Sequence, residues 1–285
     1  MAGKPMGKTL RTILRHWRLF AWMDLVWITR QPGFFLTYFV SDMLLALGTI
    51  ATTFLLAARF EGIGPWSEPR VVFMLGYALL VRAVQDMFFG FNVAIISRRI
   101  GRGQLDHVLI QPHPVWLTLL TEGFVPFSGA MALIPGAALV LWAARQLALH
   151  PAALWLGLAA INLLASCAIT LAFSFLWGSV AYWAPRAAEE ISSAAMSIMR
   201  EISPFPLDGL GPIWLGGLLT ALPTGFVAWY PCRALLGIDP APYAPVVTPL
   251  AAVLLSGLAA IVFYRGLMHY GRVGSQRYLS FGHRR

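Results

Sequence analysis

The chain has 285 residues, of which 58% are hydrophobic and 12% are charged, with a formal net charge of +9. Soluble domains contain about 25% charged residues, so this composition excludes a soluble globular protein and indicates an all-α, polytopic membrane protein. The two cysteines, Cys167 and Cys232, have no partners at metal-ligand spacing and do not form a disulfide framework.

Residues 8–30 predict an amphipathic helix that lies in the membrane surface. Apolar residues recur at helical spacing from Leu10 to Trp17, and most of the basic residues fall on another side: Arg11, Arg15 and Arg18. Such arginines reach the lipid headgroups while the apolar side enters the interface. The alternative is a basic helix that binds nucleic acid or a calmodulin-type partner. Pro32 and Gly33 are expected to end the helix before the bilayer.

Residues 2–9 fit a relaxed phosphate-binding loop, because four residues separate Ala2 from Gly7-Lys8-Thr9. Ala2 stands where the strict motif has glycine, and Pro5 lacks the N–H that would bind phosphate. We therefore expect this chain to bind no nucleotide and no other cofactor.

Hydropathy predicts six membrane spans. Five are unambiguous: 34–58, 71–97, 115–143, 152–183 and 246–264. The fifth in chain order has two interpretations. Hydropathy alone makes 187–203 a surface helix and 213–232 the span. Alternatively, 187–205 crosses the membrane with its polar face turned inward, and 206–232 is a re-entrant segment.

The distribution of Lys and Arg predicts the orientation. Residues 1–32, 97–114 and 265–285 contain fourteen of them, whereas the three loops on the other side contain four. Since positive residues favour the cytoplasm, both termini and the 97–114 segment are expected there. We divide the chain into a cytoplasmic N-terminus with the surface helix (1–33), one transmembrane domain (34–267) and a basic cytoplasmic tail (268–285).

Several polar residues in or beside the spans form a candidate intramembrane path: Asp42, Arg82, Gln85, Asp86, Asn92 and Glu122. An ionisable group inside a span is costly unless it is paired or wetted. Arg82 and Asp86 stand four residues apart and can pair on one helix. The structural alternative is therefore a self-satisfied pair that packs against another helix.

A stripe of small polar residues repeats every four positions on the fourth span: Asn162, Ser166, Thr170 and Ser174. Such residues let helices approach closely and hydrogen-bond to each other. We interpret the stripe as a packing seam, with a substrate route as the alternative.

No zinc-protease or nucleophile-elbow motif occurs. One loop contains residues that could in principle hold a metal: Asp106, His107 and His113. A polar loop at the interface explains them more simply, so no catalytic and no metal site is expected. Two other functions remain open. One is a membrane-embedded enzyme that acts on lipid through Arg82, Asp86 and Glu122, and the other is a stand-alone channel or secondary transporter.

The segment 97–118, SRRIGRGQLDHVLIQPHPVWLT, contains three arginines, then Gly-x-Leu-x-x-x-Leu and Pro-x-Pro. Leu105, Val108 and Leu109 predict a short apolar face that could dock into a groove on a cytoplasmic partner. The alternative is an interfacial loop whose arginines set the topology.

This segment resembles the coupling segment of ABC type-2 transporter permeases. A later series of short motifs is similar to the same family: Pro204–Leu207, Pro212–Leu215, Leu222–Thr224 and Arg233–Gly237. Gly62–Trp66 and Gly103–Asp106 resemble a branch of small bacterial permeases. The resemblance in motif order and span count covers nearly the whole chain. Glu189, Glu190, Arg200 and Glu201 depart from the pattern, because they would make an unusually polar fifth span.

The resemblance implies a permease subunit of an ATP-driven exporter in the bacterial inner (cell) membrane. Residues 8–30 would be the connecting helix, 98–110 the coupling helix, and 206–232 re-entrant from the outer side. Two copies of a separate ATPase subunit, with ATP and Mg, and a second permease chain, identical or related, would complete the transporter. The implied coupling residues are Arg98, Arg99, Arg102, Gly103, Leu105, Asp106, His107 and Leu109. No nucleic acid is implied as a partner.

Overall fold

The computed structural model describes residues 6–59, 64–94, 96–101, 103–150 and 152–274, and these residues form helices, turns and connections but no ladder of strands. The helices are α1 (Met6–Arg30), α2 (Pro32–Arg59), α3 (Glu68–Ala94), α4 (Ile96–Gly101), α5 (Leu105–Leu109), α6 (Val115–Thr121), α7 (Leu133–Gln146), α8 (Ala153–Ser179), η1 (Val180–Tyr182), α9 (Pro185–Ile202), α10 (Pro212–Leu219), η2 (Thr224–Phe226), α11 (Trp229–Leu235) and α12 (Ala244–Val273). The N-terminal match to a phosphate-binding loop begins at Ala2, outside the described residues, whereas Gly7, Lys8 and Thr9 belong to α1.

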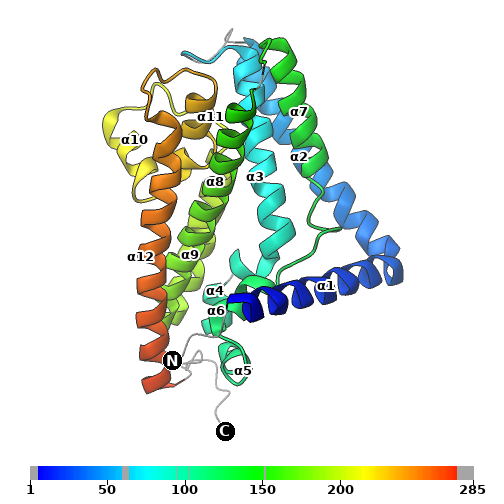
Figure 1. Ribbon diagram of the computed structural model, residues 1–285, viewed down its shortest axis with the longest axis vertical. Helices are drawn as coiled ribbons and strands as arrows, with labels where there is room; N and C mark the ends of the chain where they lie inside the picture. The colour runs from blue at the N-terminus through cyan, green and yellow to red at the C-terminus, as the bar shows by residue number, and fades with distance from the viewer. Residues whose placement is uncertain (1–5, 60–63, 95, 102, 151, 275–285) are drawn as a thin grey trace.

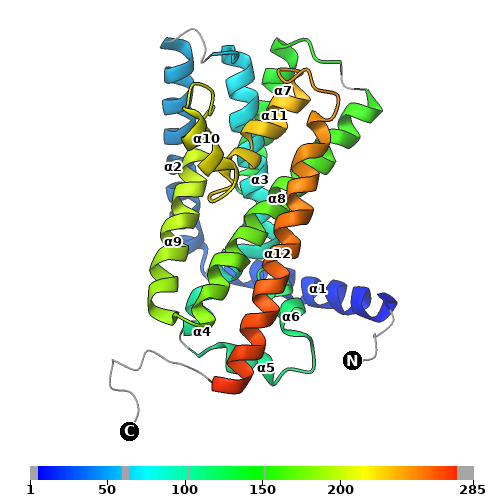
Figure 2. The same cartoon turned by 90° about the vertical axis from the view of Figure 1, so that its left-hand side faces the viewer.

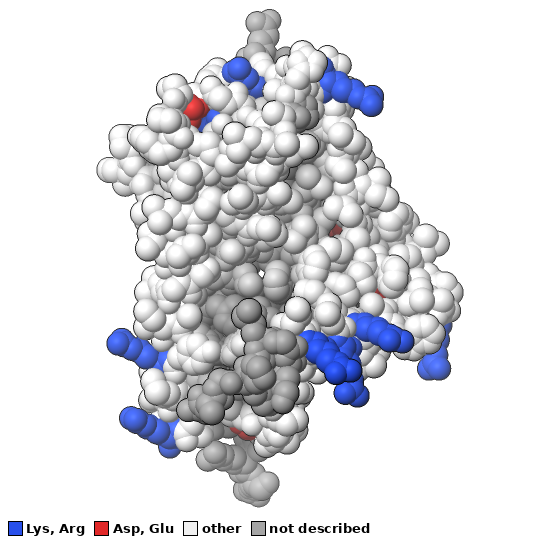
Figure 3. Space-filling view, viewed as in Figure 1, with Lys and Arg blue, Asp and Glu red and all other residues white. Residues whose placement is uncertain are grey.

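The long helices stand upright side by side, and α1 lies across one end of them (Figures 1 and 2). The short helices α4, α5 and α6 and the end of α12 lie at this end, which we call the α1 end. Helices α10 and α11 lie at the opposite end, the α10 end. On the face in Figure 3, Lys and Arg gather near the two ends and leave the middle almost free of them, as expected for a membrane protein.

By length and composition, four of the described helices could cross a membrane: Pro32–Thr52, Glu68–Gly90, Ala153–Tyr182 and Ala244–Val273. The bent pair formed by α10 and Thr224–Leu235, with an angle of 69°, would add a fifth as a broken span or a re-entrant loop. The predicted first, second, fourth and last spans correspond to the four helices. The last one continues beyond residue 267, where we expected the cytoplasmic tail to begin.

The prediction of one continuous span over 115–143 is wrong, because α6 ends at Thr121 and α7 begins only at Leu133. Gly123 lies so close to α3 that a Cβ there would be 2.0 Å from the Phe89 carbonyl oxygen. Gly90 has φ +48° and kinks α3 at the same place, where the Val125 N–H donates to the Met87 carbonyl at 2.8 Å. Two glycines therefore allow two interrupted helices to meet backbone to backbone.

The polar stripe on α8 is a packing seam, as predicted. Asn162 and Ser166 are fully buried. The Asn162 side chain donates to the Pro245 carbonyl of α12 at 3.0 Å, and the Ser166 hydroxyl lies 3.1 Å from the Tyr77 hydroxyl of α3. These contacts bond α8 to a helix on each side.

At the α10 end, one carboxylate joins three segments that are distant in sequence. The Asp208 carboxylate accepts hydrogen bonds from the indole N–H groups of Trp66 and Trp229, the latter at 2.6 Å. Arg233 forms an ion pair with the other carboxylate oxygen, and its guanidinium carbon lies 5.1 Å from the centre of the Trp229 ring. This Asp208 hub attaches the start of α3 and the loop before α10 to α11.

Replacing Asp208 with Ala should lower the free energy of unfolding by about 3 kcal/mol, because it leaves a partly buried arginine and two indoles without their acceptor. Unfolding in detergent, followed by circular dichroism, measures the loss. Asp239→Ala is the matched control at the same end, since Asp239 accepts only from the Ala241 N–H at 3.1 Å and the Tyr230 hydroxyl at 3.4 Å. Equal losses in the two variants would contradict the hub.

Candidate functional site

The segment between α3 and α6 lies at the α1 end, and α5 forms its tip (Figure 1). Gly103 turns the chain between α4 and α5 with φ +69°. Arg102, one of the predicted coupling residues, lies outside the described residues. We call residues 96–111 the coupling segment because they contain the remaining ones.

The predicted apolar docking face is partly wrong. Leu105 and Val108 are buried, and Leu105 is completely enclosed in an apolar cluster with Ile100, Leu119 and Tyr270. Burial against α6 and α12 removes their apolar surface from water, which stabilises the segment. The exposed apolar side chains are instead Leu109 and its neighbour Ile110, with exposed fractions of 42% and 83%.

Three polar contacts attach the coupling segment to three different helices. Arg98 pairs with Glu189 of α9 at 2.7 Å, and Arg99 pairs with Glu122, directly after α6, at 2.6 Å. The Tyr270 hydroxyl of α12 donates to Asp106 at 2.6 Å. A displacement of this segment would therefore act on α6, α9 and α12 together.

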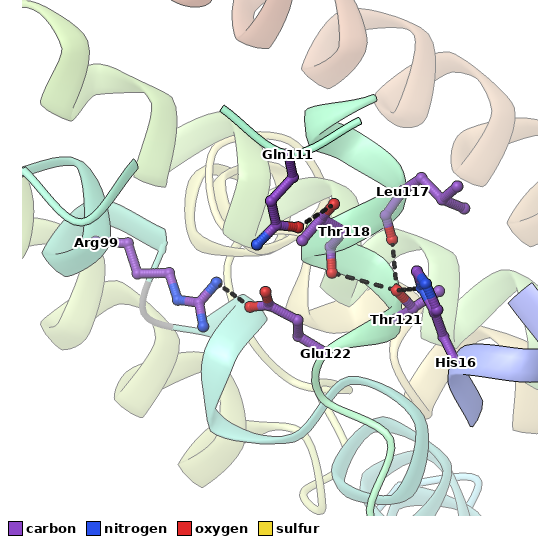
Figure 4. A network of polar contacts seen from close by, with 7 residues as sticks. All are labelled: His16, Arg99, Gln111, Leu117, Thr118, Thr121 and Glu122. Carbon is purple, nitrogen blue, oxygen red and sulfur yellow. Dashed lines mark hydrogen bonds and ion pairs between the residues drawn. The ribbon is translucent and has the colours of Figure 1, made fainter. Parts of the chain in front are cut away.

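The α6 region also contacts α1. Figure 4 shows Arg99 reaching Glu122 and, beyond Thr118, the His16 ring of α1 reaching Thr121. The His16 Nδ1 lies 3.3 Å from the Thr121 hydroxyl, and its ring meets the His113 ring edge to face. Desolvation, followed by the nearby positive charge of His113 and Arg15, lowers the pKa of His16 and favours its neutral form.

The loop that could have held a metal does not bring its residues together. Asp106 is bonded to Tyr270, the His113 ring packs against His16, and His107 is exposed. Within the described part of the chain, no group of three His, Cys, Asp or Glu side chains is placed to hold a metal ion.

The predicted intramembrane path comes together only in part. Arg82 contacts Asp42 of α2 at 2.5 Å and Asp86 at 3.4 Å, so its shorter ion pair is with another helix rather than its own. The Gln85 amide donates to the Cys167 carbonyl of α8 at 2.5 Å. Glu122 is instead bound to Arg99, and the Asn92 side chain lies outside the described residues.

Asp24 of α1 is a site residue that sequence reasoning missed. Its carboxylate accepts hydrogen bonds from the N–H groups of Phe127 and Ser128, at 2.9 and 3.1 Å, and from the Ser128 hydroxyl at 2.6 Å. Its side chain is buried, which fits a carboxylate that caps an irregular backbone. A single acid in an otherwise basic helix was the available signal.

Three cavities surround these groups. A lateral pocket of about 540 Å³ lies between α1, α2, α3 and the segment after α6, and Asp24, Asp86 and Glu122 line it. A basic pocket of about 910 Å³ borders another side of α1, lined by Arg15, His16, Arg18 and His113 among others. A small cavity of about 70 Å³ lies between α3, α8 and α9, where Asp86 and Arg200 face it.

The match to a known family covers most of these elements. The family model described as ABC-2 family transporter protein matches residues 43–274. The chain belongs to this family. No curated protein and no solved structure matches it.

Membership of the ABC-2 family confirms the resemblance drawn from the coupling segment and the later motifs. An ABC-2 permease is a multi-pass membrane transport component that associates with an ABC ATPase. The matched range contains the coupling segment, Arg82 and Asp86, whereas Asp42 and α1 precede it.

In this ABC-2 permease, Arg82→Gln should lower the free energy of unfolding by about 3 kcal/mol, because Asp42 and Asp86 lose their counter-charge. Adding Asp42→Asn should recover part of the loss, since one carboxylate no longer needs a partner. Unfolding in detergent measures both variants, with Arg145→Gln, an exposed site at the end of α7, as the control. A double variant no more stable than Arg82→Gln would contradict the cluster.

Proposed function

We propose that the chain is the permease subunit of an ATP-driven exporter in the bacterial inner membrane, with both termini in the cytoplasm. The observation that best supports this proposal is the structure of the coupling segment. It exposes Leu109 and Ile110, while Arg98, Arg99 and Asp106 bond it to three helices of the same chain. Two exposed apolar side chains on a segment that is bonded to three helices fit a docking contact with a separate ATPase subunit.

The ATPase would bind ATP and Mg, and the permease would respond mechanically. Closure of the ATPase dimer would displace the coupling segment, and Glu122, Glu189 and Tyr270 would transmit the displacement to their helices. Packed helices move as near-rigid bodies. The permease would therefore switch access to its path without making or breaking a covalent bond.

We propose six membrane crossings: α2, α3, α6 with α7, α8 with η1, α9, and α12. Helix α9 stands upright beside α8 rather than lying across the end as α1 does (Figure 2). Two of its charged residues meet polar groups of the bundle, because Glu189 binds Arg98 and Arg200 lines the small cavity beside Asp86, whereas Glu190 and Glu201 are exposed. Helices α10 and α11 then form the re-entrant segment on the outer side.

The third crossing needs its irregular part inside the bilayer. Helix α7 has 14 residues and covers about 21 Å at 1.5 Å per residue, less than the hydrocarbon thickness of about 30 Å. Residues 122–132 would supply the remainder, with N–H groups that donate to the Asp24 carboxylate and the Met87 carbonyl in place of helical acceptors.

Two permease chains, identical or related, would form the path. The small cavity between α3, α8 and α9 holds about 70 Å³, whereas ligand sites have volumes of about 300–1,000 Å³. A path of useful width along these helices would therefore be shared between chains.

Replacing Leu109 and Ile110 with Glu should abolish association with the ATPase, because two charges would enter an apolar contact. Tagged protein, purified in mild detergent from its native host, is analysed by mass spectrometry for co-purifying subunits. The wild type should retain an ATPase and the double variant should lose it, with an unchanged gel-filtration profile.

Ile213→Glu is the matched control, because Ile213 is 89% exposed but lies on α10 at the other end. It should retain the ATPase. Retention by the Leu109 and Ile110 double variant would overturn the coupling assignment, and a folded wild-type protein without any ATPase would overturn the proposed function.

A further inference from the structure

The lateral pocket combines aromatic walls with acidic groups. Five aromatic side chains line it: Phe20, Trp27, Phe34, Tyr38 and Phe124. Three carboxylates line it as well, and none of its described lining residues is Lys, Arg or His. Its volume of about 540 Å³ is suited to one drug-sized molecule.

The charges around the pocket do not balance. Asp42 and Asp86 share Arg82, and Glu122 pairs with Arg99. Asp24 accepts its hydrogen bonds from uncharged groups. Within the described part of the chain, the excess of negative charge comes from Asp24, whose partners are uncharged, and from the single arginine that Asp42 and Asp86 share. Arg82 and Arg99 both lie outside the lining. Arg200 borders the small cavity on the other side of Asp86 and does not line the lateral pocket.

The pocket opens sideways between α1 and α2. Met23 and Phe34 belong to its lining and have exposed fractions of 54% and 64%. On the proposed topology, these side chains face the acyl chains of the inner leaflet. A molecule with apolar groups could thus enter from the bilayer without crossing water.

We propose that the lateral pocket binds a lipophilic organic cation taken from the inner leaflet. Aromatic faces attract cations, and the attraction strengthens in a desolvated site. The excess negative charge of the pocket also favours a cationic ligand, and it disfavours anionic lipids and organic acids. The assignment of this cation as the transported substrate rests on the proposed transport function, whereas its binding to the pocket does not.

The basic pocket, whose lining has the opposite charge, supports the assignment of a cation to the lateral pocket. Both pockets use α1 as a wall, yet Arg15, Arg18 and two histidines face the basic pocket while Asp24 faces the lateral one. The sequence of α1 therefore separates charge between its sides, and the acidity of the lateral pocket is not a property of the whole interface.

The probe pair is tetraphenylphosphonium and tetraphenylborate, which share shape and apolar surface but carry opposite charge. Binding to the purified protein in nanodiscs of zwitterionic lipid is measured by equilibrium dialysis, with binding to empty nanodiscs subtracted. We expect saturable binding of the cation, at least tenfold tighter than that of the anion. Equal saturable binding of both ions, or no saturable binding of the cation, would overturn the proposal.

Asp86→Asn removes one pocket charge at nearly constant volume and should weaken cation binding about tenfold. Asp239→Asn, an acid at the α10 end outside the pocket, is the matched control and should bind as the wild type does. Trp27→Leu provides a second test that breaks no ion pair, and it should also weaken the cation. Unchanged binding in both Asp86→Asn and Trp27→Leu would overturn the site.

The co-purification experiment separates the two proposals. Retention of the ATPase without binding of the cation would leave the permease function standing and refute the cargo class. Cation binding by a protein that retains no ATPase would support the pocket and refute the ATP-driven exporter.

Discussion

The structure depends on one constraint, which is that backbone polar groups inside a bilayer must find partners within the protein. The chain leaves regular helix where α3 kinks and α6 gives way to α7, and again between α9 and α11. Asp24 and the Met87 carbonyl accept the N–H groups of the first irregular segment. Beside the second, Asp208 binds two indoles and an arginine. The first irregular segment is thus fixed by an aspartate of α1, and the second by its own Asp208, which binds side chains before α3 and on α11.

This constraint changes the interpretation of α1. A basic amphipathic helix needs nothing more than the interface to be stable, but α1 is also bonded to the rest of the protein. His16 contacts Thr121, and Asp24 caps residues 127 and 128. These contacts lie on both sides of Glu122. Helix α1 is therefore bonded to the same segment whose Glu122 pairs with Arg99. Direct side-chain contacts therefore join α1, the α6–α7 connection and the coupling segment.

The sequence predicted those features that repeat along a helix. Hydropathy located α2, α3, α8 and α12, and spacing by four identified the seam on α8 that Asn162 and Ser166 form. It did not predict the break after Thr121, because averaged hydropathy hides Gly123 and Pro126 within an apolar stretch. Nor did it predict that Asp42 pairs with Arg82, 40 residues away, or that Asp208 binds Trp66, 142 residues away along the chain. The apolar face of α5 was partly wrong for a similar reason: helical spacing cannot tell which side meets α12.

Glu122 is where the two proposals meet. It lines the lateral pocket, and it is also the partner of Arg99 in the coupling segment. A displacement that separates Arg99 from Glu122 would remove one positive partner from a carboxylate in the pocket wall and strengthen the attraction of the pocket for a cation. Restoring the pair would weaken that attraction, since opposite charges at 2.6 Å largely cancel at the distance of a ligand. The Gly90 kink of α3 lines the same pocket as Asp86. ATP-driven motion would then change the affinity of the pocket through one ion pair, rather than through a change in the shape of the pocket alone.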